Sequence, residues 1–253
     1  MSTSTSWTWV ACLLAGVAAA RPAAAAGQEP LQGIAEEVTI GQLDSGSAGL
    51  SGMCAALPEE SDAFLADVAR ARAIEDDDAA KEALDALEPD ARRRAAAAPN
   101  DVTAQYHLAA VMGARLDHEH GGSKMSGAEE LRDQASLVLE LDQEHAGASY
   151  MLGRIHASVL RLGGFKRFMA KALFGGGALK GASWDEAQAL LEVAVRGDPC
   201  VPDHHFELAR LYAERGDKAG AEREFAYVGE LTAGEGGREA RLRERAAEMS
   251  RDL

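Results

Sequence analysis

A short helical pattern recurs three times along the chain, and it restricts the possible folds more than any other feature. The segments YHLAAVM (106–112), YMLGRIHASV (150–159) and HFELARLYAERGD (205–217) each contain a leucine that is directly followed by a small residue. Small residues allow two helices to approach closely, and large residues fill the grooves between them. Because a single helix pair cannot bury its apolar face alone, copies of the pair must stack against one another.

A second helix follows each of these segments and repeats the alternation of small and large residues. The matching positions are Leu131, Ala135, Val138 and Gln143 in the first copy, which fits more weakly, Ala187, Leu191, Ala194 and Pro199 in the second, and Ala221, Phe225, Val228 and Ala233 in the third. Paired helices with this spacing are the signature of tetratricopeptide repeats. No strand pattern competes, so the sequence predicts an all-α fold, a tetratricopeptide-type helical solenoid. The helices are expected at about 102–116, 127–141, 146–162, 184–197, 202–215 and 218–232.

Helical patterns also flank the repeats, which we place at 101–233. Residues 59–100 predict an N-terminal, repeat-like cap in which Ser61 begins a helix. The apolar face of that helix is formed by Phe64, Leu65, Val68 and Ala71. Pro89 is expected to open or kink the next helical segment. At the other end, residues 234–253 are expected to form a C-terminal capping helix.

The first 26 residues have the pattern of an export signal. The apolar run WVACLLAGVAAA (9–20) is shorter than the ~20 residues that span a bilayer. Three alanines then precede Gly27, as signal peptidase prefers. We therefore expect a signal peptide at 1–26 and an exported protein, periplasmic or extracellular. Two features disagree with this pattern, since no basic residue precedes the apolar run and Arg21 follows it. The alternative is an uncleaved anchor or a misassigned start of the chain. A misassigned start would give a cytoplasmic protein.

Residues 27–58, rich in Gly, Ser and Gln, predict a flexible linker between the signal and the helices. Two cysteines remain after removal of the signal, Cys54 in this linker and Cys200. They could pair in an oxidising compartment. Their wide separation in the sequence and the Gly/Ser-rich surroundings of Cys54 favour two free thiols instead.

The chain is strongly acidic, and it contains no recognisable reaction centre. A formal net charge of -15 argues against nucleic acid as a main partner, because phosphate binding needs a basic surface. No Ser–His–Asp set, paired-carboxylate motif or phosphate-binding loop is present. DHEH (117–120) is expected to be a solvated turn and not a metal site, and His204 and His205 are expected to cap a helix or lie on its surface. We therefore predict no catalytic residue, no metal, no cofactor and no enzymatic activity.

An insertion interrupts the middle repeat and differs from the rest of the chain in composition. In an uninterrupted repeat the small residue of the second helix would stand at position 165, but it stands at Ala187, twenty-two residues later. The insert, 163–183, includes GGFKRFMAKALFGGG and is expected to hold an inserted helix. No acidic residue lies between His145 and Trp184. The aromatic and basic residues that we single out are Phe165, Arg167, Phe168, Lys171 and Phe174.

Two interpretations of the insert remain open. As a helix it would carry an apolar stripe, with its basic residues beside the stripe. It can fold back onto the solenoid as part of the core. Alternatively, it contacts a partner or an anionic membrane surface, as basic amphipathic helices do. The pattern SWDE (183–186) is typical of a capping box and restarts the repeat helix.

Three features together give the chain a specific resemblance. They are Leu152-Gly153-Arg154 within a helix, the Phe-and-basic segment 165–175 that ends in Phe-Gly, and a helix that begins at Ser183. In this order they resemble the regulator-of-microtubule-dynamics family of tetratricopeptide proteins and its bacterial relatives, over about 124–233. The resemblance implies an all-helical, non-enzymatic interaction protein. Because the composition and the export signal are typical of bacteria, the microtubule association of eukaryotic members is not expected here.

The first helices of the repeats predict a peptide-binding groove, because they line the concave face of such solenoids. The aromatic residues stand two positions before the repeated leucine and the arginines two positions after it. The predicted groove residues are Tyr106, Tyr150, Arg154, Phe206 and Arg210. Aromatic residues beside arginine suit an extended or helical peptide that carries a carboxylate. The alternative is that the aromatic residues only pack between repeats and that the arginines pair with local acids such as Glu207.

These observations predict a scaffold or adaptor that binds a protein or peptide partner. The alternative function is a peripheral membrane-associated module that uses the basic, aromatic insert at 163–177.

Overall fold

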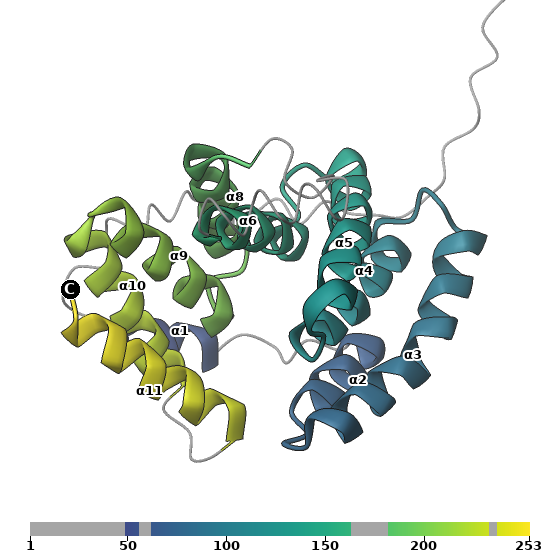
Figure 1. The fold of residues 1–253 in the computed structure, drawn as a ribbon, viewed down its shortest axis with the longest axis horizontal. Helices are drawn as coiled ribbons and strands as arrows, with labels where there is room; N and C mark the ends of the chain where they lie inside the picture. The colour runs from purple at the N-terminus through teal and green to yellow at the C-terminus, as the bar shows by residue number, and fades with distance from the viewer. Residues whose placement is uncertain (1–48, 56–61, 163–181, 233–236) are drawn as a thin grey trace, which may run out of the picture. The chain divides into compact units, whose positions relative to one another are not determined.

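All regular structure in the described part of the chain is helical. The computed structural model describes residues 49–55, 62–162, 182–232 and 237–253, and within these ranges it contains ten helices and no strand (Figure 1). The predicted all-α fold is confirmed for these residues. The helices are α1 (Leu50–Ala55), α2 (Ala63–Arg72), α3 (Asp77–Ala97), α4 (Val102–Asp117), α5 (Gly121–Leu141), α6 (Ala146–Arg161), α8 (Trp184–Gly197), α9 (Pro202–Arg215), α10 (Lys218–Leu231) and α11 (Gly237–Arg251).

Consecutive helices lie against one another along the chain. α3 contacts α4, α4 contacts α5, and α5 contacts α6, and the same order continues through α8, α9, α10 and α11. The most extensive contacts are those of α6 with α8 and of α9 with α10, the helices expected to form the second and third pairs. An array of stacked helix pairs requires this order of contacts.

Side chains at the helix starts satisfy backbone N–H groups that the first helical turn leaves free. The Ser183 hydroxyl accepts a hydrogen bond from the Glu186 N–H at 3.1 Å, as the SWDE pattern predicts. Asp62, and not Ser61, begins α2, and its carboxylate accepts from the Phe64 N–H at 2.9 Å. α9 ends at Gly216, whose φ of 81° lies in the left-handed region that favours glycine.

Pro89 does not open a new helix but lies inside α3. A proline within a helix removes one backbone hydrogen bond and crowds the preceding turn. Leu84 and Ala91, before and after the proline, are both fully buried in the same core cluster. Burial on both sides of Pro89 therefore holds the two parts of α3 in one helix, an effect that local propensity does not reveal.

Small residues of the repeats lie where helices approach most closely. Ala187 and Ala209 are fully buried, and Leu208 is 2% exposed. A Cβ atom added to Gly153 on α6 would lie 2.8 Å from Leu191 Cγ and 3.2 Å from the Ala187 carbonyl oxygen on α8. These distances leave no room for a methyl group, so the α6–α8 contact depends on glycine at this position.

A disulfide bond joins Cys54 to Cys200, so the prediction of two free thiols is wrong. Their Cα atoms lie 5.5 Å apart although 146 residues separate them in the sequence. Cys54 lies in α1, which packs against α10 with Leu50 buried, and Cys200 lies two residues before Pro202, the first residue of α9. Since α9 and α10 are packed neighbours, the array brings the two cysteines together. The predicted linker at 27–58 likewise does not hold for 50–55, which form α1.

The predicted inserted helix lies outside the described residues. This applies to Phe165, Arg167, Phe168, Lys171 and Phe174. Among the helices that are described, none combines the length and the apolar character needed to cross a bilayer.

Candidate functional site

Two of the aromatic residues predicted for the groove pack against neighbouring helices. The ring centroid of Tyr106 lies 4.3 Å from that of His145. A Cβ atom on Gly147 would lie 2.1 Å from the Tyr106 hydroxyl oxygen, so the phenol occupies the space beside that glycine. Phe206 is 3% exposed, and its ring centroid lies 6.0 Å from that of Phe225. Tyr106 thus packs between successive repeats, as the packing alternative expects, whereas Phe206 packs within the third helix pair.

Tyr150, the third of these aromatic residues, lies among charged side chains. Its ring centroid is 4.8 Å from that of His204. Burial raises the pKa of the Tyr150 phenol to about 12, although the nearby Arg154 guanidinium opposes the shift. The hydroxyl is therefore neutral at pH 7, where it can form hydrogen bonds but carries no charge.

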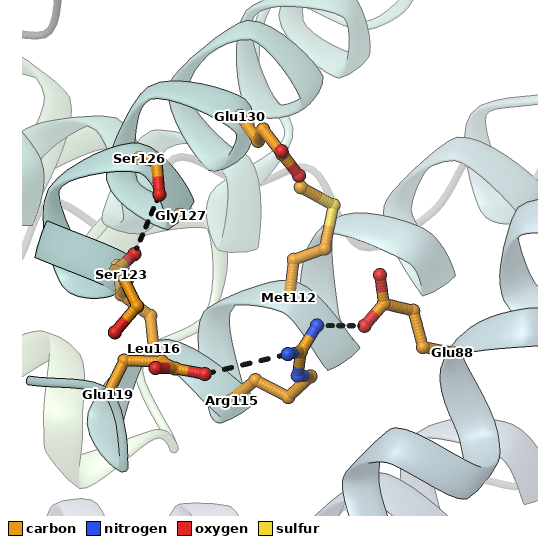
Figure 2. A pocket seen from close by; sticks show the side chains of 9 residues that line it. All are labelled: Glu88, Met112, Arg115, Leu116, Glu119, Ser123, Ser126, Gly127 and Glu130. Atoms are coloured by element: carbon orange, nitrogen blue, oxygen red, sulfur yellow. Dashed lines mark hydrogen bonds and ion pairs between the residues drawn. The ribbon is translucent and has the colours of Figure 1, made fainter.

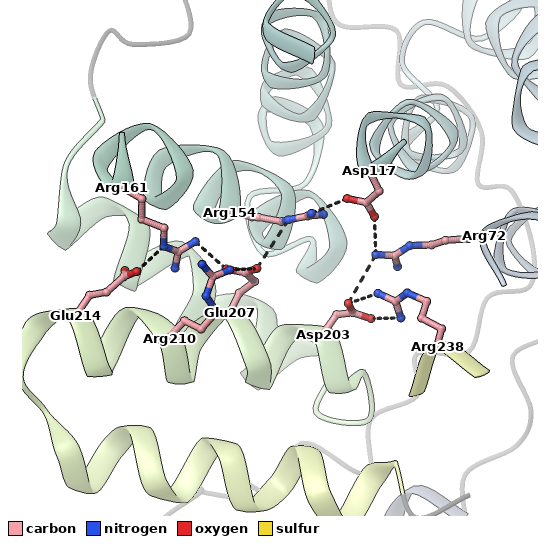
Figure 3. A network of polar contacts seen from close by, with 9 residues as sticks. All are labelled: Arg72, Asp117, Arg154, Arg161, Asp203, Glu207, Arg210, Glu214 and Arg238. Atoms are coloured by element: carbon pink, nitrogen blue, oxygen red, sulfur yellow. Dashed lines mark hydrogen bonds and ion pairs between the residues drawn. The ribbon is translucent and has the colours of Figure 1, made fainter. Parts of the chain in front are cut away.

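A network of nine charged side chains joins five helices near Tyr150, and Figure 3 shows their arrangement. We call it the arginine network. Its members are Arg72 on α2, Asp117 on α4, Arg154 and Arg161 on α6, Asp203, Glu207, Arg210 and Glu214 on α9, and Arg238 on α11. The structure thus brings together the two predicted arginines, Arg154 and Arg210, but places them among seven further charged groups.

Two aspartates connect helices that are far apart in the sequence. Asp117 accepts a hydrogen bond from Arg72 Nη2 at 3.0 Å and another from Arg154. Asp203 accepts a hydrogen bond from Arg238 Nη1 at 2.9 Å, and its Oδ1 lies 3.6 Å from Arg72 Nη2. Arg72 therefore links α4 to α9, while Arg238 attaches α11 to the same aspartate.

The surrounding arginines keep both aspartates ionised. Burial alone would raise the pKa of Asp203, but Arg72 and Arg238 outweigh it and lower the pKa to about 2. Burial of Asp117 is outweighed in the same way by Arg154 and Arg72, which lower its pKa below the ordinary value. Both groups carry a full negative charge at neutral pH.

One carboxylate, that of Glu207, is shared by three arginines. It accepts hydrogen bonds from Arg161 Nη1 at 3.0 Å and from Arg210 Nη1 at 3.1 Å, and Arg154 Nε lies 3.9 Å away. Arg161 also donates through Nε to Glu214 at 2.6 Å. The predicted groove arginines thus pair with the local acid Glu207, as the packing alternative expects.

Apart from Glu207, which was expected as a local partner of the arginines, sequence reasoning missed the other members of the network. Arg161 could have been found, because it lies seven residues after Arg154, which places both side chains on one face of α6. Arg72, Asp203 and Arg238 could not have been found in this way. Their contacts join helices that do not occupy equivalent positions in the repeat pattern, so no spacing in the sequence predicts them.

A second polar site is a cavity of about 180 Å³ between α3, α4 and α5 (Figure 2). Its lining residues are Glu88, Met112, Arg115, Leu116, Glu119, Ser123, Ser126, Gly127 and Glu130. Arg115 is already paired with Glu88 and lies 3.5 Å from Glu119. Arg115 Nε also lies 2.6 Å from Asp85, so the one guanidinium group that lines the cavity already has three carboxylate neighbours.

The turn at 117–120 is present, but three of its side chains are not solvated as predicted. Asp117 belongs to the arginine network, His118 Nδ1 lies 2.9 Å from an oxygen of Asp77, and Glu119 lies 3.6 Å from Lys81 Nζ. Within the ranges that the structure describes, no group of three His, Cys, Asp or Glu side chains is arranged to hold a metal ion.

His204 and His205 are buried, which corrects their expected surface position. The ring nitrogens of His205 lie 2.7 Å from a carboxylate oxygen of Glu224 and 2.9 Å from the Pro199 carbonyl oxygen. His205 therefore connects α9 to α10 and to the turn that holds Cys200, so its role here is structural.

Comparison with known proteins assigns the chain to a family. No curated protein sequence matches it. The family model described as Regulator of microtubule dynamics protein 1-3 matches residues 60–253, a range that includes every member of the arginine network. Because the match covers most of the chain and agrees with the all-helical fold, the protein belongs to the regulator of microtubule dynamics family.

Proposed function

We propose that the protein is a non-enzymatic scaffold or adaptor that binds a protein or peptide at the arginine network. The observation that carries this proposal is the gathering of five guanidinium groups from four helices beside Tyr150 and Phe206. Arginine and tyrosine are enriched among the residues that dominate binding energy at interfaces, and guanidinium groups bind carboxylates in a bidentate manner. The family description refers to microtubule dynamics, and we do not extend that role to this chain, since its N-terminus predicts export.

Affinity capture from the native host tests this proposal. Arg154→Gln with Arg210→Gln should lose partners that the wild-type protein captures, because both side chains lie in the network. Arg93→Gln with Arg215→Gln removes the same charge at outlying positions, where the arginines pair with Asp90 and Asp185. This control should capture the same partners as the wild type.

Circular dichroism must show that the site variant is folded at the capture temperature. If it is not, Arg154→Lys with Arg210→Lys keeps the charge but removes the bidentate geometry, and it replaces the first variant. Equal capture by a folded site variant and the control would show that the partner binds elsewhere.

We propose further that the protein is exported and works in the periplasm or outside the cell. The apolar segment at 9–20 supports this, and so does the Cys54–Cys200 disulfide, because such bonds persist in oxidising compartments. N-terminal sequencing of protein from the native host should begin near Gly27, or alternatively at Arg21. Soluble cytoplasmic protein with an intact Met1 would contradict export.

A second candidate function is peripheral membrane association through the insert. The absence of acidic residues between His145 and Trp184 in the sequence favours it, because basic segments are attracted to anionic lipid. Cosedimentation with phosphatidylserine-containing vesicles should then fall when Lys166, Arg167 and Lys171 are replaced by glutamine. Binding that is unaffected by these changes and by salt would exclude this role for the insert.

A further inference from the structure

The arginine network contains more positive than negative charge. Its nine members are five arginines and four carboxylates, so its formal charge is +1. Around Glu207, whose side chain is 8% exposed, three guanidinium groups share one carboxylate. Two of them have a further partner, Arg161 in Glu214 and Arg154 in Asp117. Burying unbalanced charge is costly, and protein structures ordinarily compensate it.

Groups next to the network do not supply the negative charge that it lacks. Tyr150 is neutral, as its raised pKa shows. Arg161 is the last residue of α6, and the chain that follows it contains no Asp or Glu before Trp184. The sequence of the insert therefore excludes it as a source of a carboxylate.

One unused hydrogen-bond donor lies beside Glu207. Arg161 Nη2 is buried and has no acceptor among the described residues. Arg72 Nε is also buried without an acceptor, but Arg72 lies at the other end of the network, next to Asp117 and Asp203 (Figure 3). Arg210 uses Nη1 for Glu207, and its guanidinium lies 5.8 Å from the centre of the Phe206 ring. The free donor of Arg161 thus lies close to the guanidinium group of Arg210, in a network that carries excess positive charge.

We propose that one carboxylate of a partner peptide binds between Arg161 and Arg210, next to Glu207, and completes the charge balance of the network. This inference rests on the proposed function and specifies its ligand. A carboxylate carries the one negative charge that is lacking, whereas a phosphate monoester carries about -1.5 to -2 at pH 7 and would reverse the imbalance. Its planar pair of oxygens also matches the donor geometry of a guanidinium group.

Fluorescence anisotropy with two labelled peptides tests the inference. The probe is a fluorescein-labelled nonapeptide of alanine, serine and leucine with one central glutamate and an amidated C-terminus, and its control carries glutamine instead. The glutamate peptide should bind about tenfold more tightly or better, because hydrogen bonds between charged groups are the strong ones. Equal affinities of the two peptides for the wild-type protein would overturn the proposal.

Variants of the network should change this affinity in opposite directions. Arg161→Gln, or Arg210→Gln if the first is unfolded, should reduce binding of the glutamate peptide to the level of the glutamine peptide. Glu207→Gln should tighten binding severalfold, since it removes the carboxylate that competes for the same donors. Arg215→Gln, on the same helix but paired with Asp185, should leave binding unchanged. A purely structural network would give no gain for Glu207→Gln, and such a result would contradict the proposal.

Competition identifies the ligand class. Acetate should displace the glutamate peptide, and inorganic phosphate at matched ionic strength should do so no better. Stronger displacement by phosphate would show that the site prefers phosphate to a carboxylate, and it would overturn the inference. If captured partners depend on Arg154 and Arg210 but the peptide pair shows no preference, the scaffold function stands and the carboxylate site fails.

Discussion

At the scale of single residues, glycines decide how closely helices approach. Gly153 and Gly229 both lie inside helices, yet their surroundings differ. A Cβ on Gly153 would meet Leu191 and the Ala187 carbonyl oxygen, whereas a Cβ on Gly229 would have no atom within 4 Å. One glycine is thus required by packing, and the other is not.

The same substitution should therefore have opposite effects at these two sites. Gly153→Ala should lower the melting temperature, because overpacking costs about 1–3 kcal/mol and exceeds the gain in helix propensity. Gly229→Ala should raise stability by about 0.5–1 kcal/mol, since it restricts the unfolded chain without a clash. Thermal melts followed by circular dichroism measure both, and a Gly153→Ala protein as stable as Gly229→Ala would disprove the close contact.

At the scale of helices, Asp203 joins three of them. It belongs to the first turn of α9, accepts from Arg238 at the start of α11, and lies close to Arg72 at the end of α2. Its side chain is 13% exposed, so its charge is poorly solvated and depends on these partners. The docking of α2 and α11 on α9 is consequently linked to the ionisation of one carboxylate.

This linkage predicts acid sensitivity. The pKa of Asp203 is about 2 in the folded protein against an ordinary value of 3.8, so its contribution is fully present above pH ~4 and is lost as pH falls through 2. The shift corresponds to about 2 kcal/mol of stability. Asp203→Asn should destabilise the protein at pH 7 by at least about that amount, because Arg238 loses its carboxylate partner and Arg72 keeps only Asp117.

Chemical denaturation at several pH values checks this expectation. The stability difference between wild type and Asp203→Asn should shrink as pH is lowered from 5 to 2. Asp67→Asn serves as the control, because the exposed Asp67–Arg70 pair contributes at most about 1 kcal/mol. A difference for Asp203→Asn that stays constant over this range would show that its ionisation is not coupled to folding.

At the scale of the whole molecule, a disulfide bond joins an early segment of the helical unit to a late one. Helix α1 has only six residues and is too short to be stable alone, yet it is held to α10 by Leu50 and to the start of α9 by Cys54–Cys200. The two cysteines are 146 residues apart in the sequence, so the bond closes a long loop. Closing a long loop strongly reduces the conformations available to the unfolded chain, which stabilises the folded protein.

Loss of this bond should lower stability markedly. Cys54→Ser, Cys200→Ser and the double variant should each lose about 2–5 kcal/mol, and all three should match the reduced wild-type protein. Denaturant titration with and without a dithiol reductant measures the effect. Non-reducing peptide mapping that finds free thiols at both positions, or single variants that differ strongly from the double variant, would contradict the bond.

The helices of the described residues and most of their ends can be predicted from local patterns in the sequence. Periodic leucines, small residues and caps such as Ser183 act within one or two turns, so they can be recognised without tertiary structure. The same local rules identified Arg154 and Arg210, because repeats place equivalent residues on equivalent faces.

Contacts between distant residues, in contrast, depend on how the helices pack. The partners of Arg72 and Cys54 lie far along the chain and depend on how the helices pack against one another, which no local pattern encodes. Pro89 stays within α3 for a similar reason, since burial of Leu84 and Ala91 outweighs its local tendency to break the helix. Side-chain patterns thus fix each helix, whereas the packing of the helices fixes the disulfide and the arrangement of charges in the candidate site.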